Sequence, residues 1–486
     1  MSAFIHTLGC RVNQYESQLL AERLADLPCS ADVHVVNTCT VTVLADRKSR
    51  QLVRRLKREH PGALVVAVGC GADAAGDQLC LAGADFVVGN RDKARLCDLL
   101  ATYLLTAETQ RTQRTIPLSV FRYPWAVTDY GSRTTDHRAS ANSASLRWTP
   151  APAGGSDDAR GVGEVSPRGE WRSLDEERLQ GPAARTRALL KVQDGCTQRC
   201  TFCRAWQVRG PLRSKAPAVA RAEAAALASG GHREVVLVGV NLAQYGQDLP
   251  DRPVLPDLLR ELLAVRGVRF RLSSLNPEGV TDELISLFAR EERLCPYLHM
   301  PLQSGDDGVL RAMGRPYTAA QYQERAWAFL RSVPGATFGA DVMVGFPGED
   351  EAAFQQTVET LAPLTPLNVH AFRFSPRVGT PAARLSPRVP AAESAQRAAR
   401  LSALAASWSR LGRERFLGAV VEVVVEDVRD TTAWGRSANY LWVKVRGAEA
   451  LRGTMPKVRL VEATEEQLVG VMLDRAEDGG DRVRGP

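Results

Sequence analysis

No apolar run in this sequence approaches the roughly 18 uninterrupted residues that a membrane-spanning helix needs, although 44% of its 486 residues are hydrophobic. The amino terminus, MSAFIHTLGC, also lacks the basic segment followed by a long apolar one that marks a secretory leader. We therefore expect a cytoplasmic protein with no membrane partner. The apolar content is ample for packed cores, and the length corresponds to about three domains.

A complete zinc ligand set is also missing. The segment KVQDGCTQRCTFC contains Cys196, Cys200 and Cys203, but no nearby His or Cys supplies the fourth ligand of a structural zinc site. Three thiolates at this spacing can instead bind one face of an iron-sulfur cluster and leave one iron open to another ligand. Zinc stays the less favoured alternative. Simple core packing is disfavoured because the loop also contains Asp194 and Arg199.

Three more cysteines each close a short apolar run near the amino terminus: Cys10, Cys39 and Cys70. From Ser2 to about residue 106, such runs alternate with helical patterns, which predicts a parallel α/β domain of flavodoxin-like type. Sites in parallel sheets gather at the carboxyl ends of strands. We therefore expect these cysteines to converge on a second cluster, with three unrelated core cysteines as the alternative.

The first helix of this domain should begin near Asn13, as its N-cap, with Glu16 as the capping-box partner. Only LPCSADV then precedes the apolar run that ends at Cys39. The remaining cysteines lie outside any motif, and we assign them to packing or the surface: Cys29, Cys80, Cys97 and Cys295.

The rest of the chain divides by composition. Residues 124–183 are rich in Ser, Pro, Gly, Arg and Thr without an apolar period, which predicts a disordered insert. From Ala184 to about Ser375 six apolar runs recur with helices between them, which predicts six βα units, with the cysteine loop directly after the first strand. After a helical stretch, GAVVEVVVEDV and NYLWVKV predict a small carboxyl-terminal β-domain.

Several motifs together resemble the radical S-adenosylmethionine (SAM) methylthiotransferases. CxxxCxxC with Phe202 before its last cysteine resembles the radical SAM signature, and TLGCRVNQYES, VVNTCTVT and VAVGC resemble the amino-terminal domain of that family. The resemblance is nearest to the branch that modifies N6-threonylcarbamoyladenosine in tRNA. It implies three domains: an amino-terminal cluster domain at 1–106, a partial (β/α)6 radical SAM barrel at 184–400 and a TRAM-like RNA-binding β-barrel at 412–474. The insert at 124–183 is a gap in the resemblance.

The resemblance also implies the cofactors. Cys196, Cys200 and Cys203 would hold one 4Fe-4S cluster whose open iron binds SAM, and the three amino-terminal cysteines would hold a second 4Fe-4S cluster. SAM contacts are expected from Gly230 and Gly231 in SGGHREV, from Asn241 in VGVNLAQYG and from Ser274 in RLSSLNPE. A turn and ordinary strand-end caps are the structural alternatives for these four residues.

Two further blocks, LHMPLQSGDDGVLRAMGRPYT and DVMVGFPGED, are typical of the same family. They place polar and charged groups where strands of the barrel should end, although turns in any α/β protein use similar residues. Arginines here could reach phosphate or carboxylate. The residues concerned are Gln303, Ser304, Arg311, Arg315, Asp341 and Glu349.

Basic residues concentrate in the predicted helix after Cys39, and the formal net charge of the chain is +7. Such a face favours a nucleic-acid partner, with a solvated helix face as the alternative. Its members are Arg47, Lys48, Arg50, Arg54, Arg55, Lys57 and Arg58.

Methylthiolation of the adenine C2 of N6-threonylcarbamoyladenosine, next to the tRNA anticodon, is the activity implied by the family. The implied electron donor is a flavodoxin or ferredoxin. Family members acting on isopentenyladenosine or on a ribosomal protein are the alternatives, followed by a non-catalytic iron-sulfur sensor that binds RNA. One departure from the family pattern is CRAWQVRG, which places Trp206 where relatives commonly have Ile-Pro.

Overall fold

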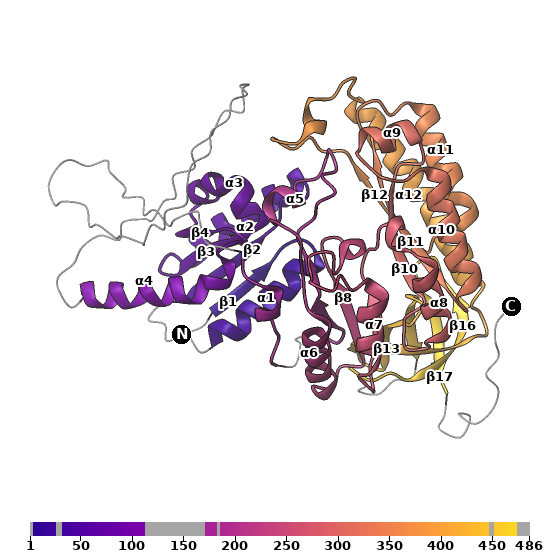
Figure 1. The fold of residues 1–486 in the computed structure, drawn as a ribbon, viewed down its shortest axis with the longest axis horizontal. Coiled ribbons are helices and arrows are strands. Elements are labelled where there is room, and N and C mark those ends of the chain that lie inside the picture. The colour runs from indigo at the N-terminus through magenta and orange to yellow at the C-terminus, as the bar shows by residue number, and fades with distance from the viewer. Residues whose placement is uncertain (1–2, 26–31, 112–170, 182–184, 447–451, 474–486) are drawn as a thin grey trace. The chain divides into compact units, whose positions relative to one another are not determined.

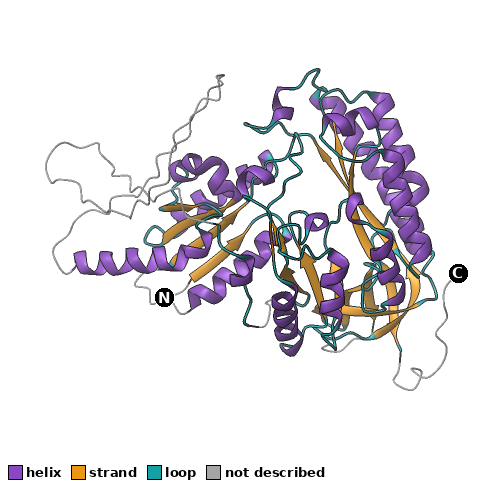
Figure 2. Cartoon of the chain, viewed as in Figure 1, coloured by secondary structure: helices purple, strands orange, loops and turns teal. Residues whose placement is uncertain are grey.

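The computed structural model describes residues 3–25, 32–111, 171–181, 185–446 and 452–473 (Figures 1 and 2). The chain divides into two compact units, one containing Met1–Asn13 and Arg23–Arg172, the other containing Gln14–Glu22 and Ser173–Pro486. Among the described helices, none combines the length and the apolar character of a bilayer-spanning segment.

A four-stranded parallel sheet organises the first unit, and its strands follow one another in chain order. A parallel α/β domain was predicted and is observed. The flavodoxin-like strand order 2-1-3-4-5 was predicted but is not observed, because LPCSADV is too short to form an additional strand and a connection back to the sheet. The elements of this part of the chain are β1 (Ala3–Thr7), α1 (Arg11–Ala25), β2 (Val33–Thr38), α2 (Val43–Glu59), β3 (Leu64–Gly69), α3 (Cys70–Leu81), β4 (Phe86–Val88), η1 (Lys93–Arg95) and α4 (Leu96–Arg111). Residues Gln14–Glu22 of α1 belong to the second unit.

The two central strands of this sheet, β2 and β3, are rich in valine, which explains why they are buried. β2 and β3 are buried along most of their length, as expected for parallel strands covered on both faces. Helix α2 is amphipathic: it buries Val53 and Leu56 against β-strand residues such as Val65, and it turns its charged residues outward.

Two three-stranded parallel sheets form the central part of the second unit, in the orders β5-β8-β9 and β10-β11-β12. Isolated parallel bridges, Phe270 to Leu294 and Ser274 to His299, connect them. The six strands therefore follow one another as six βα units, as predicted. They are β5 (Ala188–Lys191), β8 (Glu234–Val238), β9 (Arg269–Leu272), β10 (Tyr297–Gln303), β11 (Thr337–Val344) and β12 (Asn368–Arg373).

Helices and short elements connect these strands. They are η2 (Leu174–Glu176), β6 (Gln193–Asp194), α5 (Ala205–Val208), β7 (Arg213–Ser214), α6 (Pro217–Ser229), η3 (Leu242–Gln244), α7 (Leu255–Leu263), η4 (Pro277–Gly279), α8 (Asp282–Arg290), α9 (Asp307–Ala312), α10 (Ala319–Ser332), α11 (Glu351–Leu361), η5 (Ala362–Leu364), η6 (Pro381–Arg384) and α12 (Ala391–Glu414).

Part of the predicted disordered insert is ordered. Residues 171–181 include the 3-10 helix η2, and both Leu174 and Leu179 are buried. The backbone N–H of Leu179 donates to Glu223 Oε1 on α6 at 3.1 Å. These apolar anchors are too few to be recognised in a polar sequence, and the prediction of disorder is wrong for these residues. Positions 124–170 and 182–184 lie outside the described residues.

Five strands at the carboxyl end close into a barrel in the order β13-β14-β15-β17-β16. Alternating side chains fill its interior, among them Val423, Val443 and Leu460. The TRAM-like assignment stays a prediction. The strands are β13 (Val420–Arg429), β14 (Thr432–Ser437), β15 (Trp442–Arg446), β16 (Lys457–Ala463) and β17 (Leu468–Met472).

Two buried arginines of β9 connect the six-strand sheets to this barrel. Arg269 and Arg271 both pair with the fully buried Glu234 of β8, with nitrogen to oxygen distances of 2.8 and 2.7 Å. Arg271 also donates to the carbonyls of Ser437 and Ala438, both at 2.9 Å. Burial opposes ionisation of Glu234, but the arginines outweigh it and hold its pKa below the usual value. The ion pairs therefore contribute fully at neutral pH and weaken on acidification.

The substitution Glu234→Ala should destabilise the protein by about 3–5 kcal/mol, because it leaves two buried guanidinium charges without their counter-ion. Thermal and urea unfolding would measure the change. The control is Glu261→Ala, which removes a half-exposed partner of Arg221 and should cost no more than about 1 kcal/mol. Equal stability of the two variants would show that the carbonyl acceptors alone satisfy the arginines.

Candidate metal centres

Cys196, Cys200 and Cys203 lie in a loop that follows β6 at the carboxyl end of the first strand of the sheet. The loop starts at Gly195 in a left-handed conformation (φ +74°), where a Cβ atom would stand 1.9 Å from the carbonyl oxygen of Pro211. Only glycine fits there. The N–H of Cys203 donates to the carbonyl of Cys200 at 3.1 Å. The loop is therefore built to a fixed shape.

Asp194 fixes the start of this loop. Its Oδ1 accepts the N–H of Gly195 at 2.8 Å, and its Oδ2 pairs with Lys191 at 2.7 Å and Arg213 at 3.0 Å. Burial opposes ionisation of Asp194, but Lys191 and Arg209 outweigh it and hold its pKa at about 2. A permanently ionised carboxylate therefore orders the chain one residue before the first cysteine.

Every sulfur of the loop accepts a hydrogen bond from nitrogen, the pattern that tunes thiolates in iron-sulfur sites. The three donors come from the loop itself and from segments that follow β8 and β10. They are Asn241 Nδ2 to Cys196 at 3.8 Å, Arg315 Nη1 to Cys200 at 3.4 Å and the Ala205 N–H to Cys203 at 3.3 Å.

Burial raises the pKa of Cys203 to about 12 and also raises the pKa of Cys196. The neighbouring cysteine thiols raise both pKa values further. At neutral pH such thiols keep their protons until a metal displaces them. The environment therefore fits a cationic centre and gives the free thiols little nucleophilic character.

The distances between the sulfur atoms bear on whether a cysteine set suits one zinc ion or an iron-sulfur cluster. Within the described part of the chain, neither set of three cysteines has all its sulfurs within 4.8 Å of one another. Three thiolates on one tetrahedral Zn²⁺, with bonds of about 2.3 Å, would lie about 3.8 Å apart. Neither set is therefore gathered tightly enough to bind one zinc ion as it stands.

Arg315 was expected to reach phosphate or carboxylate, and the structure places it on the cysteine loop instead. Besides Cys200, its guanidinium contacts Asn276 Oδ1 at 2.8 Å and Tyr317 at 2.9 Å. Its burial within this polar network makes it a positive charge beside the thiols. Arg311, in contrast, is exposed on α9, and Glu349 accepts from Gly345 and Arg397.

Two of the four predicted SAM contacts lie at the same end of the strands as the cysteine loop. Asn241 follows β8 and is buried against Cys196, and its Oδ1 caps η3 by accepting from Ala243. Ser274 follows β9 and is exposed. A SAM contact for either residue stays a prediction.

For Gly230 and Gly231 the prediction is wrong. They terminate α6, where their N–H groups donate to the carbonyls of Ala226 and Ala228, and Gly231 has φ +89°. They precede β8 and so lie at its amino end, opposite the cysteine loop. The Gly-Gly pair is a helix stop, the structural alternative considered from the sequence.

Gln303 is a further polar group at the carboxyl end of β10. It is 7% exposed, its φ is +71°, and its Oε1 has no hydrogen-bond partner among the described residues. Buried polar atoms are nearly always paired in native proteins, and strained backbone clusters at binding sites. Gln303 therefore fits a position that contacts a bound cofactor such as SAM. Its neighbour Ser304 is buried and accepts the N–H of Asp306 at 3.2 Å.

The amino-terminal cysteines also follow strands, as predicted: Cys10 after β1, Cys39 after β2 and Cys70 after β3. Their loops approach closely. Gly9, beside Cys10, has φ +92°, and a Cβ atom there would lie 2.6 Å from the sulfur of Cys39. Asn90 Nδ2 donates to Cys70 at 3.5 Å. The three loops thus converge at one edge of the sheet.

Asn13 is not the N-cap that the sequence indicated, because α1 begins at Arg11. The buried Asn13 amide donates instead to the carbonyls of Leu8 at 2.8 Å and Thr38 at 3.0 Å, joining the cysteine-bearing ends of β1 and β2. Glu16 pairs with Lys191 at 2.9 Å and is not a capping-box partner. Tertiary partners overrode the local signal in both cases.

Helix α2 carries the basic residues predicted to bind RNA. Lys57 pairs with Asp85 at 2.7 Å, and Arg50 donates to Gln78. The remaining basic side chains are exposed along the helix: Arg47, Lys48, Arg54, Arg55 and Arg58.

Comparisons with known proteins agree with this division of the chain. A family model described as the Radical SAM superfamily matches residues 190–361, and one described as Uncharacterized protein family UPF0004 matches residues 2–89. The Threonylcarbamoyladenosine tRNA methylthiotransferase MtaB of Bacillus subtilis (strain 168) is 31% identical over 96% of both chains. The tRNA-2-methylthio-N(6)-dimethylallyladenosine synthase of Syntrophobacter fumaroxidans is 32% identical over 97% of this chain and 96% of that protein.

Among solved structures, the fold is similar to the radical S-adenosylmethionine methyltransferase TsrM from Kitasatospora setae. The TM-score is 0.51 at 15% identity, covering 79% of this chain and 77% of that one. At this identity the likeness concerns the fold alone.

Proposed function

Because this chain belongs to the radical SAM methylthiotransferases, we propose that it attaches a methylthio group to C2 of N6-threonylcarbamoyladenosine in tRNA. The observation that carries the proposal is the presence of two three-cysteine sets, each at the carboxyl ends of parallel strands. A binding protein that only senses iron would need one such set and no site for SAM.

The residues present fit the implied cofactors. Cys196, Cys200 and Cys203 would hold a 4Fe-4S cluster with SAM at its open iron, and Cys10, Cys39 and Cys70 would hold a second. When bound, these groups supply reductive cleavage of SAM and a sulfur-borne methyl group, chemistry that belongs to the cofactors.

This chain's own residues hold the cysteine loop in position and limit the access of water to it. The three nitrogen donors hold the loop sulfurs in place, and Asp194 fixes the loop's first turn. Gln303 offers an unpaired carbonyl oxygen to a ligand at the carboxyl end of β10. Phe202 packs, like Phe372 and Phe374, against a buried apolar cluster, which limits water around the cysteine loop.

Support for a tRNA substrate comes from the name of the Bacillus relative and from the exposed arginines and lysine of α2, whose phosphate contacts would make binding steeply salt dependent. The carboxyl-terminal barrel would add RNA contacts as a TRAM-like domain. A flavodoxin or ferredoxin would supply electrons. Isopentenyladenosine is the second candidate substrate, favoured by the 32% identity to the dimethylallyladenosine enzyme.

The test is anaerobic reconstitution with iron, sulfide, SAM and dithionite, followed by mass spectrometry of nucleosides from two tRNA anticodon stem-loops. One carries N6-threonylcarbamoyladenosine and the other isopentenyladenosine. We expect a 2-methylthio product on the first stem-loop. Product on the second stem-loop alone would transfer the assignment to isopentenyladenosine, and 5′-deoxyadenosine with no product on either would remove tRNA as the substrate.

A further inference from the structure

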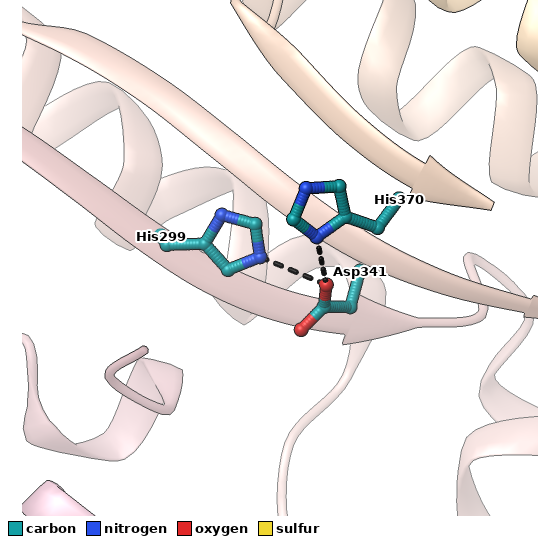
Figure 3. A group of neighbouring side chains, drawn as sticks. All are labelled: His299, Asp341 and His370. Atoms are coloured by element: carbon teal, nitrogen blue, oxygen red, sulfur yellow. Dashed lines mark hydrogen bonds and ion pairs between the residues drawn. The ribbon is translucent and has the colours of Figure 1, made fainter. Parts of the chain in front are cut away.

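His299, Asp341 and His370 form a compact polar triad on neighbouring strands β10, β11 and β12 (Figure 3). Both histidines bond to the same carboxylate oxygen: His299 Nε2 lies 2.9 Å, and His370 Nδ1 lies 3.0 Å, from Asp341 Oδ1. Strand register aligns Asp341 with His370 directly. The three side chains therefore share one face of the sheet.

Further contacts fix the triad. Tyr297, two residues before His299, brings its hydroxyl within 3.0 Å of His299 Nδ1. Burial opposes ionisation of Asp341, but its bonds to His299 and His370 outweigh it and keep its pKa below the usual value. Asp341 is therefore an anion at neutral pH, and it holds both rings in defined orientations.

The triad opens toward one side. The exposed fraction of the side chains rises from 9% for His299 and 23% for Asp341 to 69% for His370. In Figure 3 the second oxygen of Asp341 and the second nitrogen of His370 lie at opposite ends of the bonded pair, and neither carries a dashed line. Nε2 of His370 and Oδ2 of Asp341 are thus placed to meet a ligand.

This face leads to the cysteine loop. Met343 and Phe372 are paired in register two residues beyond Asp341 and His370, so alternation puts them on the same face. They belong to one apolar cluster with Phe202, which lies between Cys200 and Cys203. Two residues of strand span about 7 Å. Asp341 and His370 of the triad therefore lie on the same face as Met343 and Phe372, two residues earlier along their strands.

On the basis of the proposed function, we propose that His299, Asp341 and His370 bind the polar side chain on N6 of the modified adenosine. A threonylcarbamoyl group carries a carboxylate, a hydroxyl and N–H groups, which match the donors and acceptors of an imidazole and a carboxylate. An isopentenyl group has no such atoms and would leave Nε2 of His370 and Oδ2 of Asp341 without a ligand partner, which a polar site penalises. The triad would thus select the substrate.

A divalent metal is the competing ligand, because two histidines and a carboxylate are a known iron donor set. The observed geometry favours hydrogen bonds. One ring nitrogen of each histidine points at Asp341 itself, at ordinary hydrogen-bond lengths, and the phenol of Tyr297 contacts the other nitrogen of His299.

Binding of fluorescent anticodon stem-loops to the anaerobically reconstituted enzyme tests the proposal. One stem-loop carries N6-threonylcarbamoyladenosine and the other carries unmodified adenosine at the same position. The variant His370→Ala should weaken binding of the modified stem-loop about tenfold, the value of one hydrogen bond to a charged group, and leave binding of the unmodified one unchanged. Arg373→Ala, an exposed change on the same strand, is the control and should not alter the preference.

Equal weakening of both stem-loops, or no weakening, would overturn the triad's role even if the wild type forms product. A different result would overturn only the proposed activity: His370→Ala loses the preference for the modified stem-loop, but the wild type forms no methylthio product. A stoichiometric divalent metal in the wild type that His370→Ala loses, measured by mass spectrometry, would make the triad a metal centre and refute the proposal.

Discussion

Replacing Cys196, Cys200 and Cys203 together with alanine should lower the iron content of the reconstituted protein from about eight to about four atoms per chain, from two clusters of four irons each. It should also abolish 5′-deoxyadenosine formation from SAM. The three sulfurs accept hydrogen bonds from Asn241, Arg315 and the backbone, and alanine removes the only ligands in this loop.

Iron and sulfide analysis and chromatography of SAM products would measure these effects. The variant Cys97→Ala, in α4 and outside both cysteine sets, controls for the loss of a half-buried cysteine and should keep both the iron and the cleavage. Unchanged iron in the triple variant would mean that this loop holds no cluster.

Replacing Cys10, Cys39 and Cys70 together with alanine should have a different outcome: about four irons and SAM cleavage remain, while the methylthio product falls below detection. The reason is that these cysteines follow β1, β2 and β3 of a separate sheet and, as we propose, serve sulfur transfer and not radical formation.

Parallel measurement of 5′-deoxyadenosine and of 2-methylthio nucleoside separates the two roles. Circular dichroism guards against misfolding, since Cys39 and Cys70 are buried. Methylthio product from this variant would show that the amino-terminal cysteines are dispensable, and loss of SAM cleavage would show that the two sets do not act independently.

Local patterns made the cysteine positions predictable. A strand-then-cysteine arrangement repeats three times in the amino-terminal unit, and the parallel topology alone predicts that such positions meet. CxxxCxxC is similarly self-contained, because its three ligands lie within eight residues. The presence of a parallel sheet and the convergence of the loops followed from these short-range signals, whereas the strand order of the first sheet did not.

Long-range partners were not predictable in the same way. Arg315 reaches a cysteine 115 positions away in sequence, and no local pattern distinguishes it from any other arginine after a helix. Asn13 looked like a cap because its neighbours have helix-start composition, but its amide is used between two strands. The pair Gly230 and Gly231 did indicate a turn, and it ends α6. The family resemblance instead suggested a SAM contact, which would lie at the other end of the following strand.

The triad of His299, Asp341 and His370 shows the same limit. Asp341 was singled out from its motif, but its two histidines lie in separate runs, 42 and 29 positions away. Strand register joins them, and register is a property of the assembled sheet.

The arginine forks of β9 make the carboxyl-terminal barrel hard to remove. Arg269 donates to the carbonyls of Glu422 and Arg436, and Arg271 to two more in the same barrel. A chain truncated after Phe416 would lose all four acceptors, so poor yield or aggregation of that fragment would say nothing about RNA. Replacing an exposed basic residue such as Arg459 on β16 with a neutral one is a better test of RNA binding, because it leaves the hydrogen bonds of Arg269 and Arg271 to the barrel intact.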